Sequence, residues 1–149
     1  MAIEREQPYP CQNFLVDLGD GDPQSEDSAF AEVEGLETWV EVIEYRNGAD
    51  RDATPTKLIG LNKVADVVLK RGFTGSLRLY RWFDAVRNGE ANVQRTVTIT
   101  LLSEDRSAIA TWKLLRARPV RYAVGPLLAE GADVVVEELV LAYERLEME

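Results

Sequence analysis

The side chains that could do chemistry in this 149-residue chain are mostly carboxylates, because it holds 26 Asp and Glu residues, one cysteine and no histidine. Without histidine, Ser–His and Cys–His nucleophile pairs and histidine metal sites are excluded. Paired carboxylates remain open, but Asp17, Asp20, Asp22 and the Glu137–Glu138 pair fall on loops or alternate across strands, which is typical of solvated faces. We therefore expect no catalytic residue and no enzyme.

Two segments look like ligand loops but lack residues that such loops need. Asp20, Asp22 and Asp27 suggest a calcium loop, yet glycine is missing from its sixth position and Ala31 occupies the twelfth, where Glu is needed. The segment Gly72-Phe73-Thr74-Gly75 lacks the Gly-Lys-Ser/Thr of a phosphate-binding loop. Weak calcium binding stays an alternative, and we expect no metal and no cofactor.

The single cysteine and the three tryptophans are interpreted as structural. Cys11 alone can form no intrachain disulfide and no cysteine cluster, so it is predicted to be a small core or edge residue. Trp39, Trp82 and Trp112 are interpreted as core anchors, because indole rings more often fill a core than a ligand cage.

The charge balance argues against a nucleic-acid or membrane partner. The chain has 17 basic and 26 acidic residues, a formal net charge of −9. Nucleic-acid binding needs clustered Lys and Arg, which this sequence offers only weakly. A stretch of about 18 apolar residues, as a membrane span requires, is absent, and residues 1–10 lack a secretory signal. We expect cytoplasmic assembly of one domain, 1–149, with a flexible N-terminus, 1–10.

Strand patterns dominate the chain. Period-two alternation or high β propensity predicts strands over 12–18, 29–34, 37–45, 64–71, 93–102, 108–117 and 133–146. One helix is predicted over 77–88, capped by Ser76, with Leu79, Trp82, Phe83 and Val86 on one face. The sum is a mainly β fold, an antiparallel β-sandwich or partly closed barrel with one flanking helix.

Irregular stretches separate these elements. The acidic run 19–28 is predicted to be an exposed, mobile loop. The stretch 46–62, rich in Gly, Asp and Thr, is longer than most connections and is therefore predicted to have a function. Pro119 and Gly125-Pro126 are predicted to break the chain. Several strands are apolar on both faces, so we expect a helix or another copy of the protein to cover the second face.

A series of short motifs, in order from about Asn13 to Glu147, resembles the phage tail tube protein family. The segment Phe30-Ala31-Glu32-Val33-Glu34-Gly35-Leu36 is similar to the F-x-E-V-x-G-L segment of that family. It is followed by Glu44-Tyr45-Arg46-Asn47-Gly48, Lys57-Leu58-Ile59-Gly60-Leu61, Leu69-Lys70-Arg71-Gly72, Ala110-Thr111-Trp112, Ala117-Arg118-Pro119, Gly125-Pro126-Leu127 and, from Glu138 to Glu147, the closing strand. Each motif alone is weak, whereas the ordered series over nearly the whole chain is specific.

The resemblance implies a structural subunit of hexameric rings that stack into the inner tube of a contractile phage tail or phage-tail-like injection system. Such a tube is a conduit for cargo or DNA and part of a virion tail or released particle. The implied partners are further copies of the chain and the sheath and baseplate proteins of the same machine. The long loop 46–62 would reach a neighbouring subunit or ring through Arg46, Gly48, Arg51, Lys57 and, just after it, Lys63.

The surface that lines the bore has one candidate in the sequence. The polar face of 93–102 carries Gln94, Thr96, Thr98 and Thr100; an ordinary solvent face is the other reading. An acidic bore would let anionic cargo slide without sticking.

Departures from the family pattern leave other functions open. Ile59 stands where the family usually has Pro, and Tyr143 and Arg145 stand where it often has His and Gly. A tube initiator or baseplate adaptor with the same fold is therefore one alternative, and a ligand-binding β-domain is another from a different class.

Overall fold

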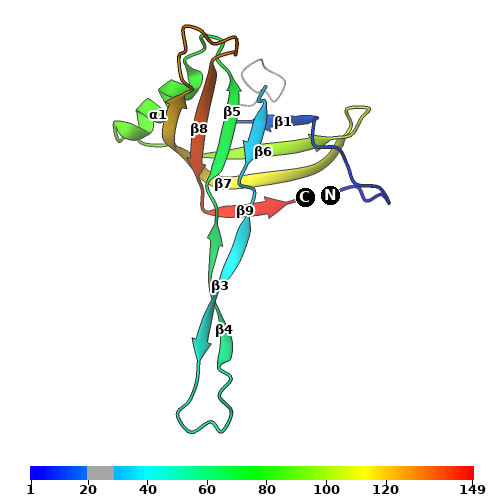
Figure 1. Ribbon diagram of the computed structural model, residues 1–149, viewed down its shortest axis with the longest axis vertical. Helices are drawn as coiled ribbons and strands as arrows, with labels where there is room; N and C mark the ends of the chain where they lie inside the picture. Colours follow the sequence, from blue (N-terminus) through cyan, green and yellow to red (C-terminus); the bar gives the residue numbers. More distant parts are fainter. Residues whose placement is uncertain (20–28) are drawn as a thin grey trace.

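Strands dominate the computed structural model, which describes residues 1–19 and 29–149 (Figure 1). The elements are β1 (Phe14–Asp17), β2 (Glu32–Glu34), β3 (Thr38–Tyr45), β4 (Thr56–Val64), β5 (Val67–Gly72), α1 (Arg78–Arg87), β6 (Arg95–Leu102), β7 (Ala108–Val124), β8 (Val136–Ala142) and β9 (Arg145–Met148). The predicted mainly β fold with one helix is confirmed. The acidic loop, apart from Gly19, and the candidate calcium ligands Asp20, Asp22 and Asp27 lie outside the described residues.

Seven strands form one antiparallel sheet in the order β1-β6-β7-β8-β5-β2, with β9 also paired to β7. Strand β7 joins the two halves of this sheet, because its first part pairs with β6 and β9 and its last part pairs with β8. The two halves run across one another in Figure 1, β6, β7 and β9 in one direction and β5 and β8 in the other. The sheet therefore folds over itself as a sandwich.

The prediction that Pro119 breaks the chain is wrong. Pro119 is buried inside the 17-residue strand β7, at the register irregularity between Pro119 and Arg121. Proline has no N–H for a regular ladder, so a strand holds it best where the pairing is already interrupted. The same irregularity lies where β7 passes from one half of the sheet to the other.

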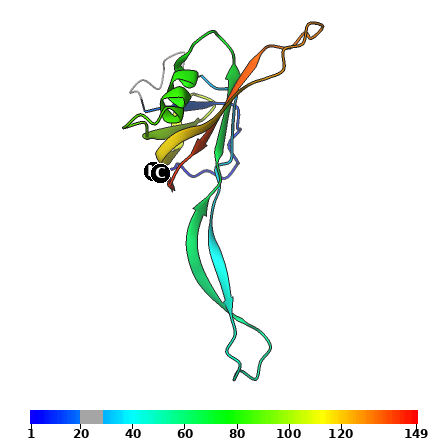
Figure 2. The ribbon, with the colours of Figure 1, turned by 90° about the vertical axis from the view of Figure 1, so that its left-hand side faces the viewer.

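The core fills the space between the two halves of the sheet. One half contributes Val16, Val97, Ile99 and Leu114, and the other contributes Val67, Leu69, Leu139 and Leu141. Helix α1 lies beside this core (Figure 2) and adds Leu79 and Trp82 to it. The predicted apolar face of the helix is thereby confirmed. The helix ends at Asn88–Gly89 as predicted, with Gly89 at φ +73°.

An ion pair is buried at one end of the core. Arg71 on β5 stands opposite Glu137 on β8, and its Nε donates to Glu137 Oε1 at 2.5 Å. Tyr122 on β7 donates its hydroxyl to Glu137 Oε2 at 2.7 Å. Burial, and then the bond to Glu137, raises the pKa of Tyr122 to about 12. A one-residue slip of β5 against β8 would put Arg71 and Glu137 on opposite faces of the sheet, so the pair helps to fix the register of the two strands.

The predicted strand 133–146 is two strands. Strand β8 ends at Ala142, and after Tyr143 and Glu144 the chain enters β9, which pairs with the first part of β7. The apolar alternation shifts at this break, because Tyr143 and Leu146 both pack on the core although they are three residues apart. The prediction treated the segment as one strand and so missed the change of partner.

The N-terminal segment lies along the turn between β6 and β7. Ile3 donates its N–H to the Ile109 carbonyl at 3.0 Å, and Arg5 pairs with Glu104 at 3.1 Å. Cys11 is exposed, which excludes the core alternative of its prediction and leaves the edge alternative.

Candidate assembly interface

Strands β3 and β4 form a hairpin that projects from the body of the molecule (Figures 1 and 2). They are antiparallel from the Thr38–Val64 pair to the Tyr45–Thr56 pair, with an irregularity between Val40 and Val42. In the described part of the chain they pair only with each other. This hairpin, residues 38–64, is referred to below as the arm. The stretch predicted as irregular over 46–62 is therefore a strand from Thr56 onward, and only residues 46–55 connect β3 to β4.

The arm exposes apolar side chains along its whole length. Every residue of β3 is exposed, and on β4 Ile59 and Leu61 are 70% and 66% exposed. The exposed large apolar residues of the arm are Trp39, Val40, Val42, Ile43, Tyr45, Leu58, Ile59 and Leu61. A two-stranded hairpin is only marginally stable in water by itself, and a contiguous apolar patch of this kind marks an interaction site. The arm is therefore the candidate interaction surface of the molecule.

Gly35 sets the direction in which the arm leaves the body. Its φ is +98°, and a Cβ at this position would lie 2.2 Å from the carbonyl oxygen of Asp66. Nearby, Ala65 donates its N–H to the Glu37 carbonyl at 3.1 Å. The two chain segments at the base of the arm thus approach too closely for any side chain at position 35. This explains the glycine of the F-x-E-V-x-G-L motif.

Replacing Gly35 with alanine is expected to destabilise the protein by about 1–3 kcal/mol from backbone strain alone. The contact with Asp66 adds to this because a backbone atom has to move. In a chain of this size each kcal/mol lowers the melting temperature by about 2–4 °C. Gly48→Ala is the matched control, since a Cβ at Gly48 would meet no atom within 4 Å outside its chain neighbours and its φ is not positive. Equal melting temperatures for the two variants would contradict this account.

The tip of the arm is organised by Arg46. Its Nε donates to the Asp52 carbonyl at 3.0 Å and its Nη2 to the Asp50 carbonyl at 2.9 Å. The Asp50 carboxylate accepts the Asn47 N–H at 3.1 Å. Arg51 is exposed at this tip and makes no hydrogen bond or ion pair with any described residue. The guanidinium of Arg51 is therefore available to a partner, whereas that of Arg46 holds the turn.

The sequence from residue 10 to residue 147 matches the family described as T4-like virus tail tube protein gp19. The chain belongs to this tail tube family. Among curated proteins, no sequence matches it.

Solved structures with the same fold come from contractile injection systems. A chain of the anti-feeding prophage baseplate is 31% identical, with a TM-score of 0.83 and 97% of each chain covered. A chain of the sheath–tube complex of an extracellular contractile injection system, PVC, is 26% identical, with a TM-score of 0.82 over 97% of this chain and 93% of that one. Hcp1 from Flavobacterium johnsoniae, at 13% identity, a TM-score of 0.53 and coverage of 91% and 93%, shares the fold alone. The family and the fold inferred from the ordered motifs are thus confirmed.

The residues predicted for assembly all lie on the arm of this tail tube fold. Arg46, Gly48 and Arg51 are gathered at the tip, while Lys57 and Lys63 lie along β4. Lys57 stands opposite Glu44, and Lys63 Nζ lies 3.5 Å from Glu41 Oε1. Exposed pairs of this kind contribute about 0–1 kcal/mol at most.

The apolar residues of the arm were missed as site residues. The prediction that Trp39 anchors the core is wrong, because Trp39 is 45% exposed and lies on the arm, whereas Trp82 is buried and Trp112 packs on the core. The available signal was the Trp-Val-x-Val-Ile run, which is apolar on both faces of one strand. A strand in a single sandwich needs only one apolar face.

The candidate bore residues lie on the sheet half made of β1, β6, β7 and β9. Thr98 and Thr100 are half-buried and stand beside Lys113 and Thr111 of β7, on the face opposite Val97 and Ile99. Thr96 is exposed near the start of β6, and Gln94 is exposed just before that strand. The structure thus places the four predicted residues on or next to one polar face that points away from the core.

Metal-binding and membrane-spanning features were searched in residues 1–19 and 29–149. Within these ranges, no three His, Cys, Asp or Glu side chains come together in a way that could hold a metal ion. The one helix they contain is too short and too polar to cross a membrane.

Proposed function

We propose that this chain is a subunit that forms hexameric rings, and that these rings stack into the inner tube of a contractile phage tail or phage-tail-like injection system. Such a tube would assemble in the cytoplasm and conduct cargo or DNA within a virion tail or released particle. The observation that carries the proposal is the arm, an exposed two-stranded hairpin with apolar side chains along its length. Membership of the tail tube family supports it.

The sheet half β1-β6-β7-β9 supports closure into a ring. Within the described residues, β1 pairs only with β6 and β9 pairs only with β7, so one edge of each strand is unpaired. Each of these edge strands has four residues. Successive strands are antiparallel, so β9 of one copy beside β1 of the next would continue the alternation. Free edges of this kind pair with other chains, and a head-to-tail contact that closes gives a ring.

The polar face of the same sheet half would line the bore. In a ring joined through β1 and β9, the core stays on one side of the sheet, and Thr96, Thr98 and Thr100 lie on the other. Threonine offers hydroxyls without charge, and Lys113 beside Thr98 has its Nζ 3.0 Å from Glu149 Oε1. The subunit as a whole is acidic at −9. A bore of this chemistry would have little affinity for anionic cargo. The outer surface of the tube would then meet sheath and baseplate proteins.

Negative-stain microscopy and sedimentation velocity on the purified chain test the proposal. We expect rings of six subunits and, as the concentration rises, stacks of rings with one constant diameter. A chain that sediments as a monomer at every concentration and shows no ring would contradict the proposed function.

A tube initiator or baseplate adaptor is the second candidate, because one of the similar structures, at 31% identity, is a chain of a baseplate. An adaptor needs a ring with two different faces, of which only one accepts tube subunits. The same micrographs separate the two functions. Tubes of unlimited length indicate the main subunit, and rings that never stack indicate the adaptor.

A further inference from the structure

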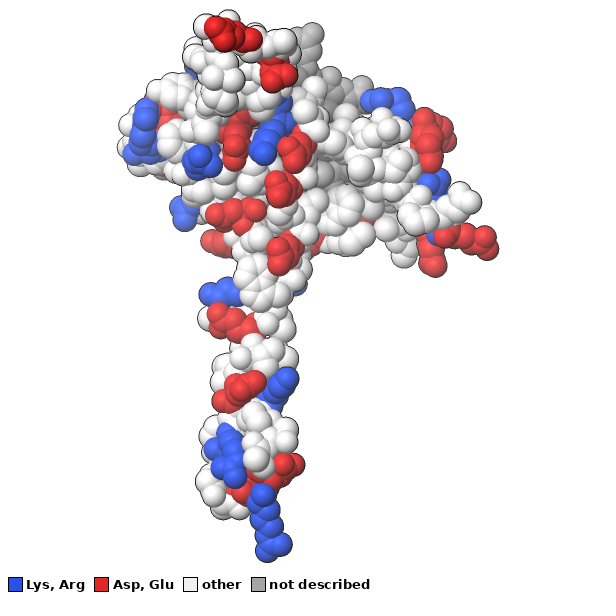
Figure 3. All heavy atoms as spheres, in the orientation of Figure 1, with Lys and Arg blue, Asp and Glu red and all other residues white. Residues whose placement is uncertain are grey.

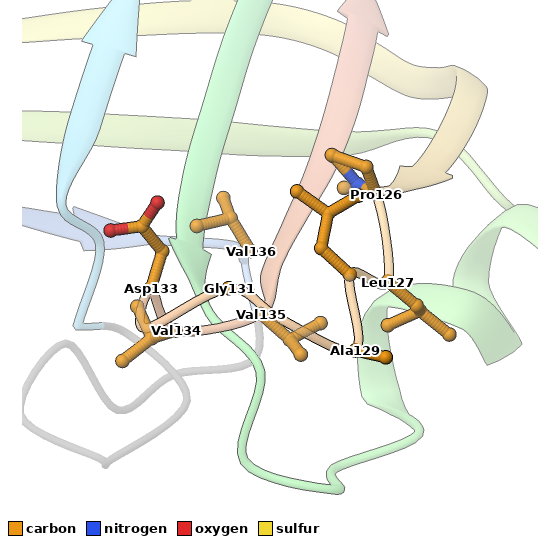
Figure 4. Close-up of a pocket in the computed structure, with 10 residues that line it drawn as sticks. Pro126, Leu127, Ala129, Gly131, Asp133, Val134, Val135 and Val136 are labelled. Atoms are coloured by element: carbon orange, nitrogen blue, oxygen red, sulfur yellow. The ribbon is translucent and has the colours of Figure 1, made fainter.

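The loop between β7 and β8, residues 125–135, is a second exposed apolar surface. Leu127 and Val134 are 77% and 78% exposed, and Leu128 lies between them on the same loop, also exposed. Figure 4 shows the side chains of Leu127 and Val134 on opposite limbs of the loop. Between the limbs lies a cavity of about 600 Å³, lined mainly by apolar side chains. Large side chains from another molecule could enter such a space.

Backbone hydrogen bonds hold this loop in shape. Gly125 donates to the Val136 carbonyl at 2.6 Å, and Gly131 donates to the Leu128 carbonyl at 3.1 Å. Phe73, just after β5, donates its N–H to the Val135 carbonyl at 2.8 Å. The cavity therefore rests on two strands of the sheet, and its two limbs are joined at the base and across the loop.

The loop and the arm lie at opposite ends of the molecule. In Figure 1, which has the longest axis vertical, the β7–β8 loop is at the top and the arm extends to the bottom. Copies repeated head to tail along this axis would bring the arm of one to the loop of the next. A contact between two different surfaces of this kind does not close on itself and continues as a filament.

The loop is acidic, and one arginine at the far end of the arm is unpaired among the described residues. The loop carries Glu130 and Asp133, and the tip of the arm carries Arg51. Figure 3 shows acidic residues at the loop end of the molecule and basic residues at the far end of the arm. The tip also holds Asp50 and Asp52, but their carboxylates accept hydrogen bonds from the Asn47 and Thr54 N–H groups. In a chain of net charge −9, copies repel one another overall. Two arginines and two aspartates leave the tip without net charge. Attraction between the Arg51 guanidinium, which has no partner among the described residues, and the acidic loop would favour this one orientation of the contact.

We propose that the β7–β8 loop receives the arm of the next copy along the tube, with Leu127, Leu128 and Val134 covering the apolar side chains of that arm. This inference rests on the proposed function, since it names the surface on which one ring meets the next. It assigns one role to two exposed apolar surfaces, because each would bury the other in the assembled tube.

Two double variants test this pairing. The loop variant Leu127→Ser/Val134→Ser removes the apolar limbs, and the arm variant Ile59→Thr/Leu61→Thr removes the most exposed side chains of the hairpin. All four positions are exposed, so circular dichroism should match the wild type, and the melting temperature should match that of the wild-type chain below the concentration at which tubes form. We expect each variant alone to form single rings without tubes. The control Leu127→Ile/Val134→Ile keeps the apolar limbs and should form tubes.

Mixing the two variants gives the decisive result. The loop variant keeps a working arm and the arm variant keeps a working loop, so each mixed pair can form one junction and no second one. Two-ring stacks that never grow longer are therefore expected by negative-stain microscopy. A mixture that contains only single rings would overturn the inference.

Two further outcomes separate this inference from the proposed function. Tubes formed by the loop variant at the wild-type concentration would overturn the inference without contradicting the proposed function. Loss of the rings themselves in the loop variant would have the same meaning. Absence of rings and tubes in the wild-type chain would overturn the proposed function and the inference with it.

Discussion

Replacing Ile59 and Leu61 with threonine is expected to abolish tubes while the subunit stays folded. Both side chains are mostly exposed in the single chain, so their replacement removes little from the core. Each substitution deletes roughly 1–2 kcal/mol of apolar burial at an assembled contact, at about 0.8 kcal/mol per buried methylene. The two together weaken each contact by about 2–4 kcal/mol, or about 30- to 700-fold in dissociation constant. Sedimentation and negative-stain microscopy over a concentration series measure the effect.

The control for the arm keeps its positions and its apolar character. Exchanging the two residues, Ile59→Leu with Leu61→Ile, conserves volume, and such swaps are tolerated best. This variant is expected to form tubes close to the wild-type concentration. If the threonine variant also formed tubes at that concentration, the arm would not be the contact that stacks the rings.

The sequence predicted the general fold because most strands of the body bury one face. Alternation of Val97, Ile99 and Leu101 with threonines, and the spacing of Leu79, Trp82 and Phe83, indicate a half-buried strand and an amphipathic helix, and the structure has both. These patterns arise from burial within one chain. Period-two and period-3.6 rules are therefore most informative for the body.

The arm was harder to predict because its apolar side chains are not buried within the chain. Strand β4 contains Gly60 between the Leu58–Ile59 pair and Leu61, and its pattern is not that of a strand on a single core. Its pairing with β3 is nevertheless nearly complete. Under the proposed function these side chains are buried by another molecule, so the sequence predicted a function for 46–62 but not that the segment is a strand from Thr56 onward.

The exposure of the three tryptophans also depends on contacts that lie far apart in the sequence. All three are large aromatic residues in segments predicted as strand or helix, and only Trp39 lies in a run that is apolar on both faces of its strand. Trp82 is 3% exposed and Trp112 is partly buried, while Trp39 projects from the arm. The three residues differ in whether neighbouring elements of the same chain cover the indole ring, which depends on long-range pairing. Composition therefore predicts an anchor but not which molecule it anchors to.

Trp82→Ala is accordingly expected to destabilise the subunit by about 3–5 kcal/mol, the usual cost of emptying a buried aromatic site. The indole packs on the core cluster, its Nε1 donates to the Val93 carbonyl at 2.7 Å, and the Arg95 guanidinium lies 4.7 Å from the ring centroid. Trp82→Phe keeps much of the packing but leaves that carbonyl unpaired, so its expected cost is lower, about 1–3 kcal/mol. Urea unfolding gives these values directly.

The comparison with Trp39 makes the Trp82 measurement specific. Unfolding should be followed in chains that also carry Ile59→Thr and Leu61→Thr, because assembly would otherwise add to the apparent stability. In that background Trp39→Ala is expected to change the free energy of unfolding by less than about 1 kcal/mol, as for exposed positions in general. In the otherwise wild-type chain, Trp39→Ala should instead raise the concentration needed for tubes. A Trp82→Ala cost below about 1 kcal/mol would mean that α1 does not seal the core.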